Sequence, residues 1–164
     1  MGKEEAFVKK IQEHEGIIFK ITSIYTDNQF DQQDLYQEIV YQLWKGFESF
    51  RNEAKFSTWM YRVALNTAIS QLKSRKKRPD SILVEAQILK ESEHSDPAFE
   101  ERIKVLYWHI RELNVLEKGI ILLFLEGKKY HEIAEISGLT ATNVGTRISR
   151  IKAKLKERMT KEKK

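Results

Sequence analysis

Apolar residues recur every three or four positions along most of this chain, which is the spacing of one face of an α-helix. In the second such segment, for example, Leu35, Ile39 and Leu43 step by four. Only seven glycines and two prolines are available for turns and sheets, so we predict an all-α protein. The predicted helices cover residues 7–25, 31–47, 59–76, 97–112, 116–125 and two segments after residue 130.

Local signals place the ends of these helices and divide the chain. A Ser57-Thr58 pair can cap the third helix, and Pro79 ends it. Asp96 followed by Pro97 is typical of a helix start. The segment between the two prolines has no sustained period and is rich in acidic side chains. We therefore expect two small helical domains, at about residues 1–79 and 97–164, joined by an acidic linker at 80–96.

The C-terminal segment from residue 130 reads YHEIAEISGLTATNVGTRISRIKAKLKE and fits a helix-turn-helix. Ala134 suits a close helix crossing, and Gly138 suits the positive φ of a tight turn. Thr140 can cap the second helix of the motif. That second helix is expected to bury one stripe of side chains, formed by Val144, Ile148, Ile151 and Leu155.

Small polar and cationic side chains cover the opposite face of that second helix. They suit base edges and phosphates in a DNA major groove, whereas a plain helical hairpin with a solvated basic face is the alternative. Gly145 costs on the order of 1 kcal/mol relative to Ala inside a helix. It either lets the backbone approach DNA closely or is neutral. The face consists of Thr142, Asn143, Thr146, Arg147 and Arg150.

A second basic segment, KFSTWMYRVALNTAISQLKSRKKR at residues 55–78, sets aromatic side chains beside cations. In a helix, Thr58, Arg62 and Asn66 share a strip that could hold an unpaired base, with rings for stacking and cations for phosphates. The same rings could equally fill a core. The cations at residues 73–78 favour nucleic acid, and an acidic stretch separates them from the basic C-terminal helix.

Composition excludes several other kinds of site. The 164-residue chain has no cysteine, and its four histidines are scattered, so we expect no disulfide, no metal and no cofactor. The start, MGKEEAFVKK, lacks the apolar core of a signal peptide, and the longest apolar run is too short to span a membrane. We therefore expect a cytoplasmic protein without membrane insertion, whose net charge of +5 suits a polyanionic partner.

Two stretches of the sequence resemble the extracytoplasmic-function (ECF) sigma factors of bacterial RNA polymerase, which are part of the sigma-70 superfamily. Residues 34–78, with the blocks DLYQE and FSTW-YR-A-N, resemble region 2 of that family. Residues 128–156, with the block YHEIAE-SGL-NV, resemble region 4. The resemblance covers nearly the whole chain. It implies a dissociable subunit that binds core polymerase, recognises and melts promoter DNA, and is not an enzyme.

The resemblance also implies roles for individual residues. The loop before the third helix would capture a flipped base of the −10 element, and Lys73 and the cations after it would hold the DNA backbone. For Leu43 and Trp44, core packing is the alternative to polymerase docking. The implied polymerase contacts are Asp34, Gln37, Glu38, Leu43 and Trp44. The implied −10 contacts are Arg51, Asn52, Lys55, Phe56, Thr58, Trp59, Tyr61, Arg62, Asn66, Lys73, Arg75, Lys76, Lys77 and Arg78. The implied −35 contacts are Thr142, Asn143, Thr146, Arg147, Arg150, Lys152 and Lys154.

One position departs from the family, and rival functions remain open. Gly145 and Thr146 stand where a cation followed by serine is common, so the −35 sequence cannot be copied from relatives. The family often has an anti-sigma partner, which no residue here reveals. The strongest rival is a helix-turn-helix regulator that acts without core polymerase, but it leaves residues 34–78 without a role. An RNA-binding helical protein and an enzyme are more distant alternatives.

Overall fold

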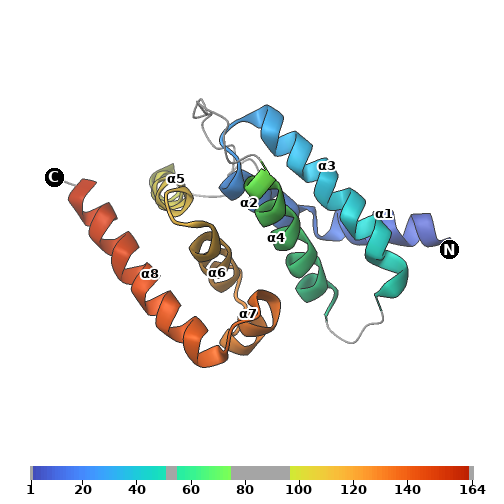
Figure 1. Ribbon diagram of the computed structural model, residues 1–164. Helices are drawn as coiled ribbons and strands as arrows, with labels where there is room; N and C mark the ends of the chain where they lie inside the picture. The colour runs from blue at the N-terminus through green and yellow to red at the C-terminus, as the bar shows by residue number, and fades with distance from the viewer. Residues whose placement is uncertain (1, 51–54, 75–96, 163–164) are drawn as a thin grey trace. The chain divides into compact units, whose positions relative to one another are not determined.

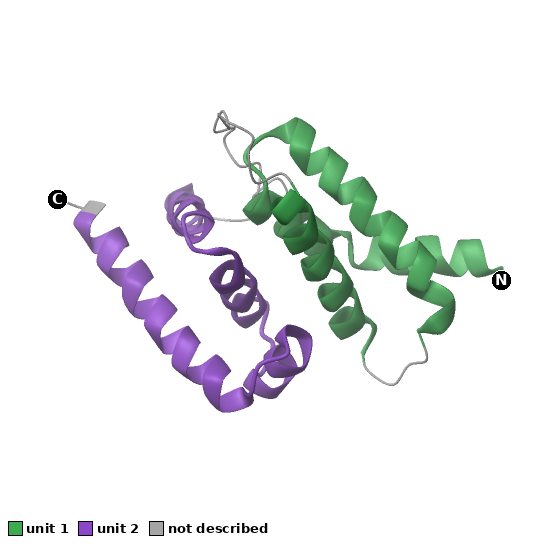
Figure 2. Cartoon of the chain, viewed as in Figure 1, with its two compact units in different colours: residues 1–84 green, residues 85–164 purple. Residues whose placement is uncertain are grey.

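The computed structural model describes residues 2–50, 55–74 and 97–162, and every regular element in those ranges is a helix (Figure 1). The chain divides into two compact units, residues 1–84 and 85–164 (Figure 2). The prediction of an all-α protein with two helical domains is therefore confirmed. The predicted linker at 80–96 lies outside the described residues, and its boundaries stay a prediction.

The first unit is a bundle in which three long helices share a core. The helices α2, α3 and α4 pack against one another, and α3 lies beside α4 (Figure 1). The side chains that fill the core are spaced by three or four residues, as the sequence predicts; they include Ile18, Ile21, Ile24, Leu35, Ile39, Leu43, Met60, Ala64 and Ala68. The elements are α1 (Lys3–Glu13), α2 (Glu15–Tyr25), α3 (Gln29–Gly46), the short 3-10 helix η1 (Phe47–Ser49) and α4 (Phe56–Ser74).

The segment predicted as one helix over residues 7–25 is two helices, so that prediction is wrong in this detail. The backbone leaves helical geometry at His14, with φ −124° and ψ 16°. The imidazole Nδ1 of His14 lies 2.9 Å from the carbonyl oxygen of Lys10 in the turn before it. The five residues from Gln12 to Gly16 contain no large apolar side chain, and this gap in the pattern marks the break.

The start of α4 also differs from the prediction. The helix begins at Phe56, so Ser57 and Thr58 lie inside its first turn and do not cap it. The backbone N–H of Trp59 already donates to the carbonyl of Lys55, at 3.1 Å. At α3, by contrast, a cap is present outside the predicted range, because the Asn28 side chain accepts from the Asp31 N–H at 2.7 Å.

The second unit contains the predicted helix-turn-helix, and its turn follows the predicted chemistry. Gly138 has φ +81°, the left-handed conformation that favours glycine. The Thr140 hydroxyl accepts from the Asn143 N–H at 3.1 Å and so caps the last helix. The predicted stripe on that helix (Val144, Ile148, Ile151 and Leu155) is buried. The elements are α5 (Pro97–Arg111), α6 (Val115–Leu125), α7 (Tyr130–Ser137) and α8 (Ala141–Glu162).

Candidate nucleic-acid and polymerase interfaces

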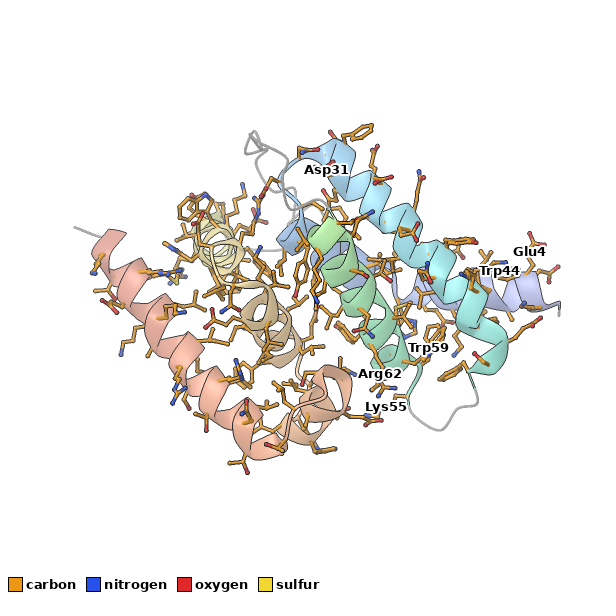
Figure 3. The ribbon with its side chains drawn as sticks, in the orientation of Figure 1. Glu4, Asp31, Trp44, Lys55, Trp59 and Arg62 are labelled. Carbon is orange, nitrogen blue, oxygen red and sulfur yellow. The ribbon has the colours of Figure 1, made fainter. Side chains whose placement is uncertain are left out.

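A polar strip runs along the exposed side of α4. Lys55, Asn66 and Lys73 are exposed and Arg62 is half-buried, at spacings that keep them on one side of the helix. No Asp or Glu occurs within the helix, so every charged side chain that α4 itself contributes to the strip is positive. Figure 3 labels Lys55, just before α4, and Arg62, in the N-terminal half of that helix. Such a strip suits a polyanionic backbone.

Trp59 lies at one end of this α4 strip in a cluster of aromatic rings. Its ring centroid is 5.1 Å from that of Phe50 and 5.5 Å from that of Phe56. Trp59 also packs over Gly46, where a β-carbon would lie 3.1 Å from the indole ring. The indole is half-buried. The cluster therefore fixes the orientation of the ring and leaves part of it at the surface, which is what base stacking requires.

Three residues expected to touch the −10 element belong to the core of the first unit. Phe56 is 9% exposed, Thr58 is 3% exposed and Tyr61 is 2% exposed. The Phe56 ring contacts His14, with centroids 5.1 Å apart, and Lys10 lies over it at 5.4 Å. These three side chains have almost no exposed surface, which disfavours the expected direct contact with DNA and favours core packing. Six others, Arg51, Asn52, Arg75, Lys76, Lys77 and Arg78, lie outside the described residues.

Some of the residues on α3 that are expected to contact polymerase are accessible, and one is buried. Gln37 is exposed, and Asp34 and Glu38 are half-buried. The side-chain N–H of Gln71 on α4 donates to Asp34 at 3.4 Å, and that of Gln42 donates to Glu38 at 2.9 Å. Leu43 is 0% exposed and packs in the core, which favours the alternative of core packing that the sequence left open.

The exposed face of α3 also carries two apolar side chains that the sequence analysis missed. Phe30 is 73% exposed and Tyr41 is 53% exposed. They lie four residues before Asp34 and four residues after Gln37, so all four share one face of the helix. This spacing was the available signal. We define Phe30, Asp34, Gln37 and Tyr41 as the α3 face.

Trp44 is half-buried beneath α1 within the first unit. Its ring meets Phe7 edge-on, with centroids 5.0 Å apart, and the Lys3 ammonium lies 4.4 Å above it. Lys3 also pairs with Glu48 at 2.7 Å, and this hydrogen bond and the lysine charge lower the pKa of the exposed Glu48 carboxyl. Packing is thus the main role of Trp44 that the contacts define (Figure 3).

In the second unit, the outer side of α8 presents the predicted polar residues. Thr142, Asn143, Thr146 and Arg150 are exposed and Arg147 is half-buried. The Arg147 Nε donates to the Asn143 side-chain oxygen one turn earlier, at 2.6 Å. The guanidinium is therefore held in one orientation, with its terminal nitrogens left to bind elsewhere. We call these five residues the recognition face.

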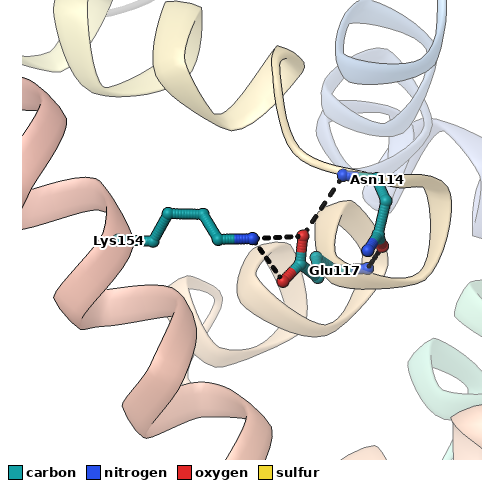
Figure 4. A network of polar contacts seen from close by, with 3 residues as sticks. All are labelled: Asn114, Glu117 and Lys154. Atoms are coloured by element: carbon teal, nitrogen blue, oxygen red, sulfur yellow. Dashed lines mark hydrogen bonds and ion pairs between the residues drawn. The ribbon is translucent and has the colours of Figure 1, made fainter.

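Lys152 and Lys154 both contact residues of α6. Lys152 lies 4.2 Å from the Phe124 ring centre. Lys154 pairs with both carboxylate oxygens of Glu117, at 3.0 and 3.2 Å (Figure 4). Glu117 also accepts from the Asn114 N–H at 3.3 Å, in the capping box that begins α6. Both lysines thus make contacts within the unit, and their expected phosphate contacts stay a prediction.

The second unit also has an apolar groove of about 630 Å³ between α5, α6 and α8. Apolar side chains such as Leu106, Phe124 and Met159 line it, with Lys152 and Lys156 beside them. A groove of this kind suits an amphipathic protein segment that carries acidic residues next to its apolar ones.

Within residues 2–50, 55–74 and 97–162, His, Asp and Glu nowhere gather in a group of three or more suited to a metal ion. None of the helices in the described part of the chain has the length and apolar character needed to cross a membrane.

The fold and these faces define a two-domain helical DNA-binding protein with a C-terminal helix-turn-helix. Two protein-family models match the chain. They are "Sigma-70 region 2" over residues 11–78 and "Sigma-70, region 4" over residues 110–155. The ECF RNA polymerase sigma-E factor of Escherichia coli strain K12 is 30% identical over 161 residues, covering 91% of this chain and 84% of that protein. The chain belongs to the ECF sigma factors of the sigma-70 family, which act in transcription initiation and are not enzymes.

Other relatives agree with this assignment. RNA polymerase sigma factor SigV of Bacillus subtilis is 29% identical over 155 residues, covering 93% of this chain and 90% of that protein. A solved structure of the sigma factor RpoE in complex with the anti-sigma factor NepR from Bartonella quintana has a TM-score of 0.76 and 17% identity, covering 95% of this chain and 98% of that one. A structure of CnrH in complex with the cytosolic domain of CnrY has a TM-score of 0.70 and 20% identity, covering 97% and 90%. The last two likenesses concern the fold.

Proposed function

We propose that this chain directs core RNA polymerase to promoters by holding one DNA strand in its first unit and duplex DNA in its second. The first unit binds the unpaired nontemplate strand of the −10 element along the α4 strip. The recognition face of α8 enters the major groove of the −35 element. Family membership, together with the chemistry of these two faces, supports this division of labour.

The observation that carries the proposal is the α4 strip with Trp59 at its end. Asn66 offers both a donor and an acceptor to a base edge, and Arg62 lies one turn away for a phosphate. Trp59 offers a ring held in place by Phe50 and Gly46. Base stacking on an aromatic side chain contributes roughly 1–3 kcal/mol per base. That is the order of what unstacking one base step costs, so binding at Trp59 can offset the withdrawal of one base from the duplex.

We propose that the α3 face binds core polymerase. Its exposed Phe30 and Tyr41 supply apolar contact area, and Asp34 and Gln37 supply polar contacts between them. An exposed aromatic pair on one helix face, flanked by polar groups, is typical of a protein–protein interface. Because core polymerase works in the cytoplasm, we place the protein there as well.

We further propose that an anti-sigma partner binds this chain. A relative of the same fold was solved with the anti-sigma factor NepR. The apolar groove of the second unit, with Lys152 and Lys156 beside it, suits a helix with acidic flanks. Such a partner is expected to block transcription by competing for a surface of the second unit.

The test is reconstitution of the full chain with core polymerase. Purified protein should co-elute with core polymerase, and the holoenzyme should transcribe selected genomic fragments that core polymerase alone does not transcribe. The variant Tyr41→Ala should weaken co-elution while keeping the thermal stability of the chain, because Tyr41 lies on the surface. The exposed Phe99→Ala variant on α5 is the matched control, because it removes an exposed aromatic side chain that is not part of the α3 face. A chain that binds DNA but neither co-elutes nor directs transcription would overturn the proposal.

A further inference from the structure

Gly145 lies at the flank of the recognition face, where α8 has no side chain of its own. It follows Thr142 by three residues and precedes Ser149 by four, so the three positions form one row along the helix. Thr142 and Ser149 are exposed and small. The row therefore leaves an open shelf beside the residues proposed to read the −35 element.

The ring of Tyr130, the first residue of α7, fills this shelf. A β-carbon added at Gly145 would lie 3.1 Å from Cε2 and 3.4 Å from Cδ2 of that ring. The ring also meets Phe124, with centroids 6.4 Å apart and planes inclined by 44°. Tyr130 is nevertheless 41% exposed. The ring is thus seated against the backbone of the recognition helix by one edge while much of it faces outward.

Packing of the Tyr130 ring explains why position 145 is a glycine. The sequence alone left open the alternative that the glycine lets DNA approach the backbone closely. The space above the glycine is already occupied by an aromatic ring of the same unit. A larger residue at 145 would displace the ring by at least a few tenths of an ångström. The shelf therefore presents aromatic C–H groups of Tyr130, one helical turn from the exposed Thr142. In the major groove, the apolar group that marks a base pair is the 5-methyl of thymine.

We propose that the Tyr130 ring, seated on Gly145, contacts the 5-methyl group of a thymine in the −35 duplex. This inference rests on the proposed function, because it needs the recognition face to enter the major groove. It adds Tyr130 and Gly145 to the residues that determine which promoter sequences the protein recognises. It also predicts that one T·A pair of the −35 element is recognised through shape and apolar contact.

The test replaces each thymine of the selected −35 element in turn with uracil, which lacks only that methyl group. Holoenzyme with the natural chain should bind one such duplex about fourfold more weakly, the effect expected for one buried methyl group. Tyr130→Ala should bind the thymine and uracil duplexes equally at that position. Tyr130→Phe should keep the fourfold difference, because the ring and its seat are unchanged.

A second variant separates recognition from packing. Gly145→Ala should not lower the thermal stability of the chain, because Ala is the better helix former and the ring lies at the surface. It should nevertheless reduce the thymine–uracil difference, because the ring is displaced. If no thymine shows a difference that Tyr130→Ala removes, or if Gly145→Ala keeps the full difference, the inference is wrong. If the natural holoenzyme selects no promoter at all, the proposed function itself fails.

Discussion

Arg147 illustrates how one side chain of the recognition face is prepared for DNA. Its Nε donates to Asn143 at 2.6 Å, so the guanidinium loses little rotamer freedom on binding. Arg147→Ala should weaken binding to the −35 duplex by about 1–3 kcal/mol and relax preference at one base pair. Core polymerase binding should be unchanged.

Because Asn143 orients Arg147, the effects of replacing the two residues should not add. Removing either partner of a contacting pair already disrupts what the pair does together. The Asn143→Ala/Arg147→Ala double variant is expected to lose less −35 affinity than the sum of the two single variants. Fluorescence anisotropy with a selected duplex measures this. Strict additivity would show that the hydrogen bond does not prepare the arginine.

Tyr36 on α3 gives a prediction about alkaline pH. Burial of the phenol, with a smaller effect of the negative charge of Glu15, raises its pKa above the ordinary 10.0. The stabilising difference is fully present below the unfolded-state pKa. As the pH rises from there through the folded-state pKa, the unfolded chain ionises first and stability is lost. Tyr36→Phe should therefore lose less stability than the natural chain above about pH 10, as urea unfolding at several pH values would show. If the free energy of unfolding fell equally with pH in Tyr36→Phe and in the natural chain, this prediction would be wrong.

At the scale of the helix, Glu117 connects the start of α6 to α8. It completes the capping box with Asn114 and pairs with Lys154 (Figure 4). Glu117→Gln keeps an acceptor for the Asn114 N–H but removes the charge. It should cost about as much stability as Lys154→Ala, roughly 0.2–1 kcal/mol for a partly exposed pair. Glu117→Ala should cost more, by about 0.5–1.5 kcal/mol, because the hydrogen bond from the Asn114 N–H to the Glu117 side chain is lost as well, while the Asn114 side chain still caps the helix.

Chemical unfolding of the three Glu117 and Lys154 variants checks this ranking. If Glu117→Gln proved as damaging as Glu117→Ala, the charge rather than the cap would connect the helices. If all three variants matched the natural chain, the network would have no role in stability.

Replacing glycine with alanine should change the stability of the chain in opposite directions at two positions, Gly138 and Gly16. Gly138 ends α7 with φ +81°, so Gly138→Ala should destabilise the chain by about 1–2 kcal/mol. Gly16 lies in the first turn of α2, with nothing within 4 Å of an added β-carbon. Gly16→Ala should stabilise the chain by about 0.5–1 kcal/mol. Thermal unfolding of both variants decides the matter, and equal signs would contradict the backbone argument.

At the scale of the whole molecule, the sequence predicted those features that local chemistry determines. The turn of the helix-turn-helix could be predicted because a positive φ calls for glycine at Gly138, and the buried stripe of α8 because its spacing is regular. The direction of the aromatic side chains on α4 could not be predicted. Helical spacing alone suits both a core and a stacking surface, and only packing places Phe56 inside and Trp59 at the edge.

Contacts between residues far apart in the sequence could not be predicted from local sequence patterns either. The seat of Trp59 on Gly46 and that of Tyr130 on Gly145 each join residues of different helices. The capture of Lys154 by Glu117 spans 37 positions. Each of these contacts changes the role of a residue proposed to meet DNA, since it fixes a ring or withdraws a charge. The roles of functional residues thus depend on tertiary packing more than the fold class does.

We propose that the first unit holds bases withdrawn from a double helix. Replacement of Asn66 is the sharpest test of this proposal, because Asn66 is exposed and lies outside the core. A promoter with 2-aminopurine in the nontemplate strand of its −10 element becomes fluorescent when that base unstacks. Holoenzyme with the natural chain should produce this rise. Asn66→Ala should reduce the equilibrium for opening by about threefold to tenfold, as loss of one hydrogen bond predicts, while duplex binding at the −35 element stays the same. Equal losses in both measurements, or no loss in opening, would contradict the account.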